Sequence, residues 1–243
     1  MGYLYETHLH TYPVSACGKA SVRETVDFYK SMNYDGIFIT NHFIGANINI
    51  SADTPYQDQL TFYCSDYYKA LEYGNTIGLK VFFGVEMSQR FENTGNPGGT
   101  DFLIYGLSPD WYQSHPELMT LELKERLALM SEDGATIVHA HPFLEASYID
   151  HIRLYPRSVH AVEIFNATKT PLENHMAAEY AKSYELLISA GSDNHRAGNI
   201  NALGGIMTEQ PICSEIEFCS MVRNRLVTPF RIDMAAPNRV IPL

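Results

Sequence analysis

The sequence of 243 residues predicts a single α/β domain in which a parallel sheet closes like a barrel. Short apolar runs alternate with longer amphipathic segments, which is the pattern of repeated βα units. We find no internal repeat, low-complexity segment or change of composition, so we expect residues 1–243 to form one domain. With 45% apolar residues the chain can bury a sizeable core, and about seven strands suit a barrel of this length.

The expected strands are short apolar runs, several of them rich in the β-branched residues that favour a buried, pleated surface. In chain order they are Tyr3–Leu9, Ile37–Thr40, Val81–Val85, Phe102–Leu107, Ala135–His139, Val159–Phe165 and Leu186–Ala190. The expected helices have apolar residues at helical spacing. They are Ser21–Met32, Asp58–Tyr73, Leu118–Met130, Leu172–Ser183 and Glu215–Arg225.

The first of these helices has the best-defined start. Ser21 and Glu24 form the S-x-x-E pattern of a capping box, and apolar residues follow at helical spacing from Val22 to Tyr29. The segment Asn93–Thr100 (NTGNPGGT) has the glycine, proline and asparagine content of a loop.

The charge balance argues against a long nucleic acid as partner. The chain carries 17 Lys and Arg against 28 Asp and Glu, a formal net charge of −11, whereas binding to nucleic acid needs clustered cations. A small anionic substrate is compatible with this charge, because a bound metal ion can dominate the local field.

The expected location is the cytoplasm, with no attachment to a membrane. No stretch reaches the ~20 apolar residues of a membrane-spanning helix, and Met1–Tyr12 lacks the basic and apolar regions of a signal peptide. The four cysteines, Cys17, Cys64, Cys213 and Cys219, form no C-x-x-C pair and are too few for a disulfide scaffold.

Histidines and carboxylates follow five of the expected strands, at the point where each strand ends. In a parallel barrel these ends meet on one face, where the active site is built. The residues are His8, His10, His42, Glu86, His139, His141, Asp193 and His195. Residues i and i+2 of a strand point to the same side, so His8 and His10 can bind one ion. A single histidine at a strand end is more often a hydrogen-bonded structural residue, but scattered structural histidines would not gather at one edge.

This mixture of side chains indicates a transition-metal centre. Imidazole and carboxylate together suit Zn²⁺, Mn²⁺ or Fe²⁺ better than Ca²⁺, which prefers oxygen ligands. The candidate side chains outnumber the ligands of one zinc ion, which favours two or three ions bridged by a carboxylate. Such centres activate water and bind the oxygens of a phosphoryl group during in-line displacement.

Six segments together resemble the PHP family, named for polymerase and histidinol phosphatase. They are THLHTYPVSACG, DGIFITNHF, FFGVEM, HAHPF, VEIFNA and AGSDNH, and they span most of the chain from Tyr5 to Gly205. The resemblance implies a distorted (β/α)7 TIM-like barrel, a centre of two or three divalent ions (Zn, Mn or Fe) and, in most members, phosphoesterase activity.

The family's metal ligands can be carried over position by position. The opening H-x-H corresponds to His8 and His10, and the glutamate that usually bridges two ions corresponds to Glu86. The T-D-H, H-P and D-x-H motifs correspond to His42, His141, Asp193 and His195. His139 has no counterpart in the family, and we expect it behind the ligands or in the core.

Three positions depart from the family pattern. Asn41 stands where the T-D-H motif has a carboxylate, and the segment Ser15–Gly18 contains Cys17 where the family usually has an aspartate. Cys17 could supply a thiolate or could be a small buried residue. Asp101 occupies the place of a family histidine and could bind metal as a carboxylate, which would decide whether a third ion is held.

The leading functional expectation is a metal-dependent phosphatase or phosphodiesterase. Its substrate would be small and phosphorylated, such as histidinol phosphate or a nucleotide, and metal-activated hydroxide would attack phosphorus. Catalytic roles are expected for Glu86, His42, His195 and Arg196. Arg196 is favoured for phosphate binding because it follows a ligand, and further candidates are Lys169, Arg153 and Arg157.

Two other functions are compatible with these residues. Amidohydrolases, which cleave C–N or C–O bonds, also begin with H-x-H, but their metal set usually ends in a lone aspartate, so the D-x-H ending favours the PHP family. A non-catalytic, metal-stabilised regulatory domain would explain the missing aspartate near Cys17.

Overall fold

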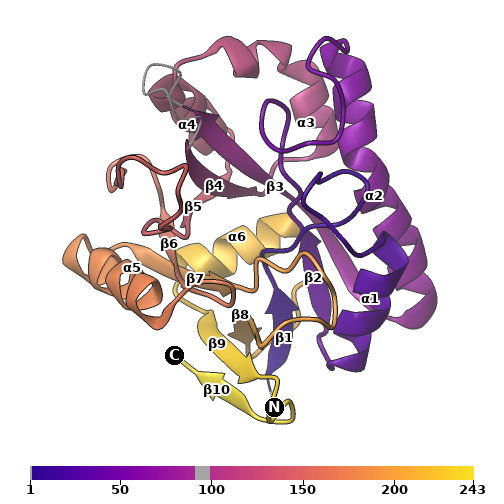
Figure 1. The fold of residues 1–243 in the computed structure, drawn as a ribbon, viewed down its shortest axis with the longest axis vertical. Helices are drawn as coiled ribbons and strands as arrows, with labels where there is room; N and C mark the ends of the chain where they lie inside the picture. Colours follow the sequence, from indigo (N-terminus) through magenta and orange to yellow (C-terminus); the bar gives the residue numbers. More distant parts are fainter. Residues whose placement is uncertain (1, 91–98) are drawn as a thin grey trace.

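The computed structural model describes residues 2–90 and 99–243, which form a mixed α/β fold around one curled sheet (Figure 1). In the described part of the chain the sheet has ten strands, in the order β10-β9-β8-β1-β2-β3-β4-β5-β6-β7. The strands are β1 (Tyr3–Glu6), β2 (Gly36–Ile39), β3 (Lys80–Arg90), β4 (Gly99–Tyr105), β5 (Thr136–Ala140), β6 (Ala161–Asn166), β7 (Leu187–Gly191), β8 (Ala202–Thr208), β9 (Thr228–Asp233) and β10 (Val240–Pro242).

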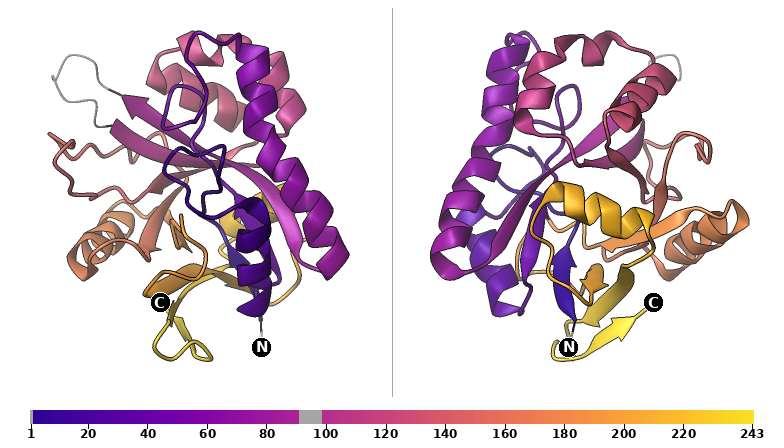
Figure 2. Two further views of the ribbon diagram at one scale, coloured as in Figure 1. Left: turned by 45° about the vertical axis from the view of Figure 1, so that its right-hand side comes forward. Right: turned by 180° about the vertical axis from the view of Figure 1, so that it is seen from behind.

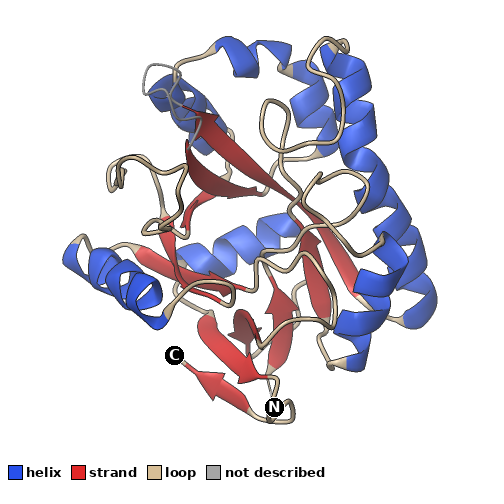
Figure 3. Cartoon of the chain, viewed as in Figure 1, coloured by secondary structure: helices blue, strands red, loops and turns tan. Residues whose placement is uncertain are grey.

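Helices surround the strands (Figure 3). They are α1 (Val22–Ser31), α2 (Tyr56–Ile77), α3 (Pro109–Ser114), a 3₁₀ helix (Pro116–Thr120), α4 (Leu123–Glu132), α5 (Pro171–Ser183) and α6 (Glu215–Arg223). No helix in the described residues is long and apolar enough to cross a membrane.

The sheet curls into a half-barrel, which is consistent with a TIM-like fold. The segments that follow β1 and β7 meet, although these strands are far apart in the strand order. The backbone N–H of Asp193 donates to the carbonyl of His8 at 2.7 Å, and the N–H of His10 donates to the carbonyl of Asn194 at 2.9 Å. Curling therefore brings the ends of two distant strands to one place.

Helix α6 covers the opposite end of the strands from these segments. It lies on the far side in Figure 1 and on the near side in the right-hand view of Figure 2. The Phe218 ring is fully buried against Phe38 and Tyr105, at centroid distances of 4.5 and 4.8 Å. Arg223 also donates to the carbonyl of Ala135, just before β5, at 2.6 Å. Apolar packing thus fills this end and leaves the other end to polar side chains.

The sheet is mixed, which corrects the expectation of a parallel sheet. Strand β4 runs antiparallel to β3 and β5, and β8 runs antiparallel to β1. Parallel neighbours need a crossover of roughly a dozen residues or more, and too few residues separate Arg90 from Gly99. Because β4 is reversed, Asp101 near its start lies opposite Ser88 and Ala140, near the ends of β3 and β5.

The capping box predicted for the first helix is confirmed. The Ser21 hydroxyl accepts from the Glu24 N–H, and the Glu24 carboxylate accepts from the Ser21 N–H at 2.8 Å. The expected helix 118–130 is instead two elements, the 3₁₀ helix and α4. Of the expected loop 93–100, the residues Gly99 and Thr100 belong to β4, and 93–98 lie outside the described residues.

Strand β8 was not predicted, because its two glycines weaken the strand pattern. The close approach of β7 accounts for one of them. A Cβ atom at Gly204 would lie 2.5 Å from the carbonyl oxygen of Gly191, so a larger residue would push β8 away from β7. Strands β9 and β10 and helix α3 were also not predicted.

Candidate metal centre

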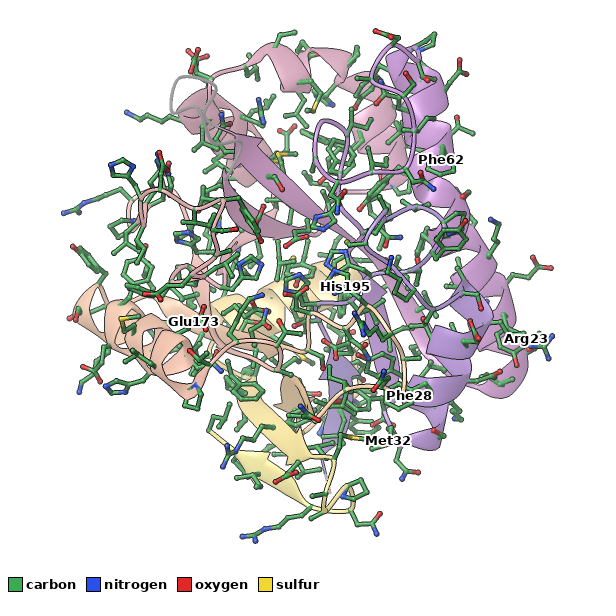
Figure 4. The ribbon with its side chains drawn as sticks, in the orientation of Figure 1. Arg23, Phe28, Met32, Phe62, Glu173 and His195 are labelled. Carbon is green, nitrogen blue, oxygen red and sulfur yellow. The ribbon has the colours of Figure 1, made fainter. Side chains whose placement is uncertain are left out.

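All eight residues expected as metal ligands lie together, where several parallel strands end and β4 begins. They are His8, His10, His42, Glu86, Asp101, His141, Asp193 and His195. Figure 4 labels His195 near the middle of the molecule, on the side that faces away from α6. The side chains of His8, His10 and Glu86 are at most 1% exposed, so the centre reaches deep into the protein.

Among the described residues, four overlapping groups can be distinguished, in each of which one ligand atom per residue lies within 4.8 Å of the others. The groups are His8, His10 and Glu86; His8, His141 and Asp193; Glu86, Asp101 and His141; and His10, Cys17, His42 and His195. We call the third the oxygen-rich group and the fourth the thiol group. Because the groups share members, they form one continuous cluster.

Glu86 occupies the middle of this cluster. Its Oε1 atom lies 3.2 Å from His8 Nε2 and 3.3 Å from His141 Nε2. Its Oε2 atom lies 2.6 Å from His42 Nδ1 and 3.3 Å from His10 Nε2. Burial raises the pKa of Glu86, but the charges of His42, His8 and His10 outweigh burial and hold the pKa well below its usual value. An ionised carboxylate between four imidazoles is placed to bridge two ions.

His8 presents its Nε2 atom to the centre because Glu163 holds its other nitrogen. Glu163 Oε1 lies 2.8 Å from His8 Nδ1. Because Nδ1 is engaged by this carboxylate oxygen, Nε2 is the nitrogen that faces the ligand groups and would bind an ion. The second oxygen of Glu163 accepts from the His141 N–H and from Asn166, each at 3.0 Å. Glu163 therefore orients one imidazole and anchors the backbone of another.

His10 is oriented in the same sense by a hydroxyl and an amide. The Ser15 hydroxyl donates to Asn41 Oδ1 at 2.8 Å, so its oxygen accepts from His10 Nδ1 at 3.1 Å. Asn41 Oδ1 also accepts from the Thr11 N–H at 2.7 Å. Asn41 thus connects the segments after β1 and β2, a role that requires no carboxylate.

His195 and Cys17 lie beside each other at the outer side of the cluster. His195 Nδ1 donates to the carbonyl of Asp193 at 2.8 Å, which leaves Nε2 free to bind an ion. Burial raises the pKa of the Cys17 thiol, but hydrogen bonds from His195 and His42 outweigh burial and lower the pKa to about 6. The side chains of His42 and His195 are 16% and 24% exposed, so these two histidines form the mouth of the centre.

Asp101 reaches the centre because β4 is reversed. Its Oδ2 atom lies 4.0 Å from His141 Nε2, and its Oδ1 atom accepts from the Ser88 hydroxyl at 2.5 Å. Burial and the charge of Glu86 raise its pKa. The carboxylate points into the oxygen-rich group rather than to solvent, and its role as a ligand stays a prediction.

Lys169 contacts the centre through Asp193. Its ammonium donates to Asp193 Oδ2 at 2.9 Å, and its side chain is 13% exposed. Burial raises the pKa of Asp193, but the charges of Lys169 and His8 hold it well below its usual value. The other carboxylate oxygen faces the cluster, 3.4 Å from His10 Nε2. Lys169, expected as a phosphate ligand, is thus already paired with a metal-ligand candidate.

The arginines expected to bind phosphate lie farther out. Arg196 is exposed and lines a hollow over α1 in which no member of the cluster takes part, and Arg157 is exposed as well. Arg153 lines a cleft together with Asp101 and His141, and it donates to Asp150 at 3.1 Å. The catalytic role expected for Arg196 stays a prediction.

His139 lies in the core, in line with its expected place. It stacks on Phe102 at a centroid distance of 5.3 Å, and its Nε2 atom lies 3.0 Å from the Thr100 hydroxyl. Burial lowers its pKa to about 3, so it is neutral at physiological pH.

Two buried glutamates were missed by the sequence reasoning. Glu163 and Glu6 each stand inside a short apolar strand and are at most 1% exposed. Carboxylates are almost never buried unless they are partnered. A glutamate within an otherwise apolar strand therefore predicts a buried carboxylate with a hydrogen-bond or ionic partner, and this pattern could have identified both residues. Burial raises the pKa of Glu6 to about 7, although hydrogen bonds from Ser192 and His8 lower it.

Replacing Glu6 by alanine is expected to destabilise the fold beneath the centre. Glu6 accepts from the N–H groups of Ser192 and His8 at 2.8 and 2.9 Å, and from the Tyr29 hydroxyl at 2.8 Å. Each buried donor left without a partner costs about 1–3 kcal/mol, so we expect a loss of roughly 3–5 kcal/mol in the free energy of unfolding. Urea denaturation of metal-free protein measures it. Glu24→Ala, which removes one exposed capping contact, should cost much less; equal losses would contradict the prediction.

Glu163→Gln is expected to weaken metal binding by ~10–100-fold, as loss of an outer partner of a metal-bound histidine does. Every group that contacts the Glu163 carboxylate is a donor, so the amide of glutamine would turn its own donor toward one of them. Competition with a coloured chelator measures the affinity. Glu179→Gln makes the same change on exposed α5 and should bind metal like the wild type. Unchanged affinity in Glu163→Gln would show that Glu163 does not orient His8.

The donor set fits divalent metal ions. The Nδ1 atoms of His8, His10 and His195 are held by outer hydrogen bonds, as described above, and Glu86 Oε2 and His42 Nδ1 form a buried ion pair 2.6 Å apart. A metal ion that binds these side chains would displace the proton of the imidazole. Imidazole with carboxylate suits zinc, manganese or iron, and the donor set leaves the identity of the metal open.

Comparison with curated proteins gives one short match. The uncharacterized protein MJ0417 of Methanocaldococcus jannaschii is 36% identical over 83 residues, which are 31% of this chain and 35% of that protein. The match thus spans about a third of the relative. No protein-family model matches the chain.

Solved structures match over nearly the whole chain. A two-domain protein of Bacteroides vulgatus that contains a predicted PHP-like metal-dependent phosphoesterase has a TM-score of 0.63 at 15% identity, covering 94% of this chain and 64% of that one. PsfC of Pseudomonas syringae has a TM-score of 0.58 at 16% identity, covering 97% and 93%. An amidohydrolase of Chromobacterium violaceum has a TM-score of 0.55 at 13% identity, covering 92% and 96%. The chain therefore shares its fold with PHP-like metal-dependent phosphoesterases, in agreement with the resemblance of its motifs.

Proposed function

We propose that the protein is a metal-dependent phosphoesterase that hydrolyses a small phosphorylated substrate, such as histidinol phosphate or a nucleotide. The observation that carries this proposal is Glu86, whose two oxygens face the imidazoles of separate ligand groups. Divalent ions bound there would supply a water nucleophile of lowered pKa and stabilise charge on the phosphoryl oxygens.

The residues of the chain have distinct roles in this proposal. The buried floor of the metal centre is formed by His8, His10, Asp193 and Glu86. These side chains would hold the ions in place and exclude bulk water. His42 and His195 lie at the mouth, where an imidazole that is free to carry a proton could donate it to the leaving oxygen. No serine or cysteine nucleophile is required, so we expect no phosphorylated protein after an acid quench.

The segment of His151, Ile152 and Arg153 is a candidate for contact with the rest of the substrate. With Asp101 and His141 it lines a narrow cleft of about 20 Å³, so the substrate would contact the rim of this cleft. This segment supplies both a cation and apolar surface next to the centre. We propose that it contacts the substrate's leaving group, with Arg196 as a further candidate for binding phosphate from the outer side.

The test is turnover by purified protein loaded with Mn²⁺ or Zn²⁺. The substrates are p-nitrophenyl phosphate, its diester, histidinol phosphate, a set of nucleotides and a set of N-acyl amino acids. Metal-dependent release of phosphate, or cleavage of the diester, supports the proposal. Hydrolysis of the amides alone would assign the protein to amidohydrolase chemistry, which the likeness to the Chromobacterium violaceum structure makes the second candidate. A fully metal-loaded protein that hydrolyses none of them would favour a regulatory domain.

A further inference from the structure

We propose that the thiol group, His10, Cys17, His42 and His195, is a thiolate-containing site that prefers a softer ion such as Zn²⁺, beside an oxygen-rich group that accepts a harder ion such as Mn²⁺. The inference rests on the metal centre of the proposed function. It adds that the thiol group and the oxygen-rich group of that centre select different metals. The ligand atoms of the thiol group lie within 4.8 Å of one another.

The backbone holds Cys17 at this place. The N–H of Ala16 donates to the carbonyl of Asn47 at 2.9 Å, and the N–H of Lys19 donates to the carbonyl of His195 at 2.7 Å. A Cβ atom at Gly18 would lie 2.8 Å from the backbone carbon of Thr11, so the loop is folded tightly onto the segment after β1. Hydrogen bonds on both sides of Cys17 therefore fix it beside His195.

A second observation points to an ion at this end. Glu86 is 1% exposed, and its Oε2 atom is directed toward imidazoles of the thiol group. That atom faces two members of the thiol group, His42 Nδ1 at 2.6 Å and His10 Nε2 at 3.3 Å. In the metal-free protein the imidazoles supply the positive charge that this buried carboxylate needs, and a metal ion bound among them would take over that role.

The two ends differ in the chemistry of their donors. The oxygen-rich group offers two carboxylates and one imidazole, whereas the thiol group offers a sulfur and three imidazoles. Carboxylates suit magnesium and manganese, and thiolate with imidazole suits zinc. His10 also belongs to the group with His8 and Glu86, so Cys17, His42 and His195 are the ligands particular to the thiol site.

The other described cysteines are unsuited to this role. Cys64 and Cys219 are buried elsewhere and belong to none of the four ligand groups, and Cys213 is exposed. Cys213 therefore offers a matched control.

Cobalt substitution tests the site through a signal that does not depend on turnover. Co²⁺ bound to a thiolate gives a near-ultraviolet charge-transfer absorption that imidazole and carboxylate ligands do not give. We expect this absorption in the wild type and in Cys213→Ser, and its loss in Cys17→Ser. A wild-type cobalt protein without the absorption would overturn the proposal. Its presence in a protein inactive on phosphate esters would refute the proposed function and leave the thiolate site in place.

Competition between metals tests the selectivity. Protein given one equivalent each of Zn²⁺ and Mn²⁺ should hold zinc at the thiol group and manganese at the oxygen-rich group, and Cys17→Asp should bind zinc at least ~10–100-fold more weakly. Unchanged metal ratios in Cys17→Asp would overturn the selectivity.

Alkylation of the wild type avoids any variant that fails to fold. With iodoacetamide and peptide mass spectrometry, Zn²⁺ should protect Cys17 far more than Mn²⁺ does, while Cys213 reacts equally throughout. Equal modification of Cys17 with and without Zn²⁺ would overturn the thiolate site.

Discussion

Replacing Glu86 by alanine is expected to lower kcat/KM for a phosphate ester by about 10³-fold or more. Removing a single well-placed electrostatic contact from an active site costs about 10²–10³-fold, and a bridging carboxylate acts on two ions at once. The two oxygens of Glu86 face His8 and His141 on one side and His42 and His10 on the other. The alanine variant would lose the carboxylate that is shared by two of the ligand groups.

Elemental analysis of the same variant distinguishes loss of bound metal from loss of catalytic activity in a protein that still holds its metal. We expect Glu86→Ala to hold fewer ions than the wild type, because both groups that contain Glu86 lose a ligand. Glu86→Gln should keep the shape of the side chain without its charge and should also lose most of its activity. Glu179→Ala, on the surface of α5, is the control and should behave like the wild type. Turnover by Glu86→Ala at the wild-type rate would rule out a bridging role.

Removal of metal by a chelator is expected to abolish hydrolysis and to lower the melting temperature. A ligand at a hundred times its Kd stabilises the folded protein by about 2.7 kcal/mol. For a domain of this size that corresponds to roughly 5–10 °C in Tm. Activity assays and thermal denaturation after dialysis against a chelator, and again after addition of Mn²⁺ or Zn²⁺, measure the two effects. Asp193→Asn should show a smaller shift, because one carboxylate of the centre is neutralised. A chelated protein that keeps its activity and its Tm would show that hydrolysis does not depend on metal.

Metal affinity is also expected to rise with pH. Burial lowers the pKa of His8, but the carboxylates of Glu163, Asp193 and Glu86 outweigh burial and raise the pKa well above its usual value. Burial likewise lowers the pKa of His42, and the charge of Glu86 raises it well above normal. The metal-free centre therefore holds protons that a metal ion must displace. Lowering the pH favours protonated histidines over metal-bound histidines. The increase in Tm that metal binding causes should therefore shrink as the pH falls.

Local pattern was enough to identify most elements and the ligands that follow them. The capping box of Ser21 and Glu24 depends on contacts within one helical turn. The pairing of His8 with His10, whose Nε2 atoms lie 3.4 Å apart, follows the two-residue spacing in the segment after β1, which ends at Glu6. These features lie within a few residues of each other, so they can be seen in the sequence. The motif resemblance then led to Asp101, whose position opposite Ala140 no periodicity indicates.

The direction of β4 and the surroundings of each ligand were decided by tertiary structure. A strand of either direction has the same side-chain alternation, so the alternation did not show the reversal that carries Asp101 to the centre; the short connection between Arg90 and Gly99 became evident only with the observed strand bounds. The partners of Glu163 and Lys169 are His8 and Asp193, which are 155 and 24 residues away in the chain. Such pairs form because the sheet curls and brings distant strand ends together. The sequence by itself therefore determined which side chains gather at the strand ends, and the curled, mixed sheet decided how each of them is oriented.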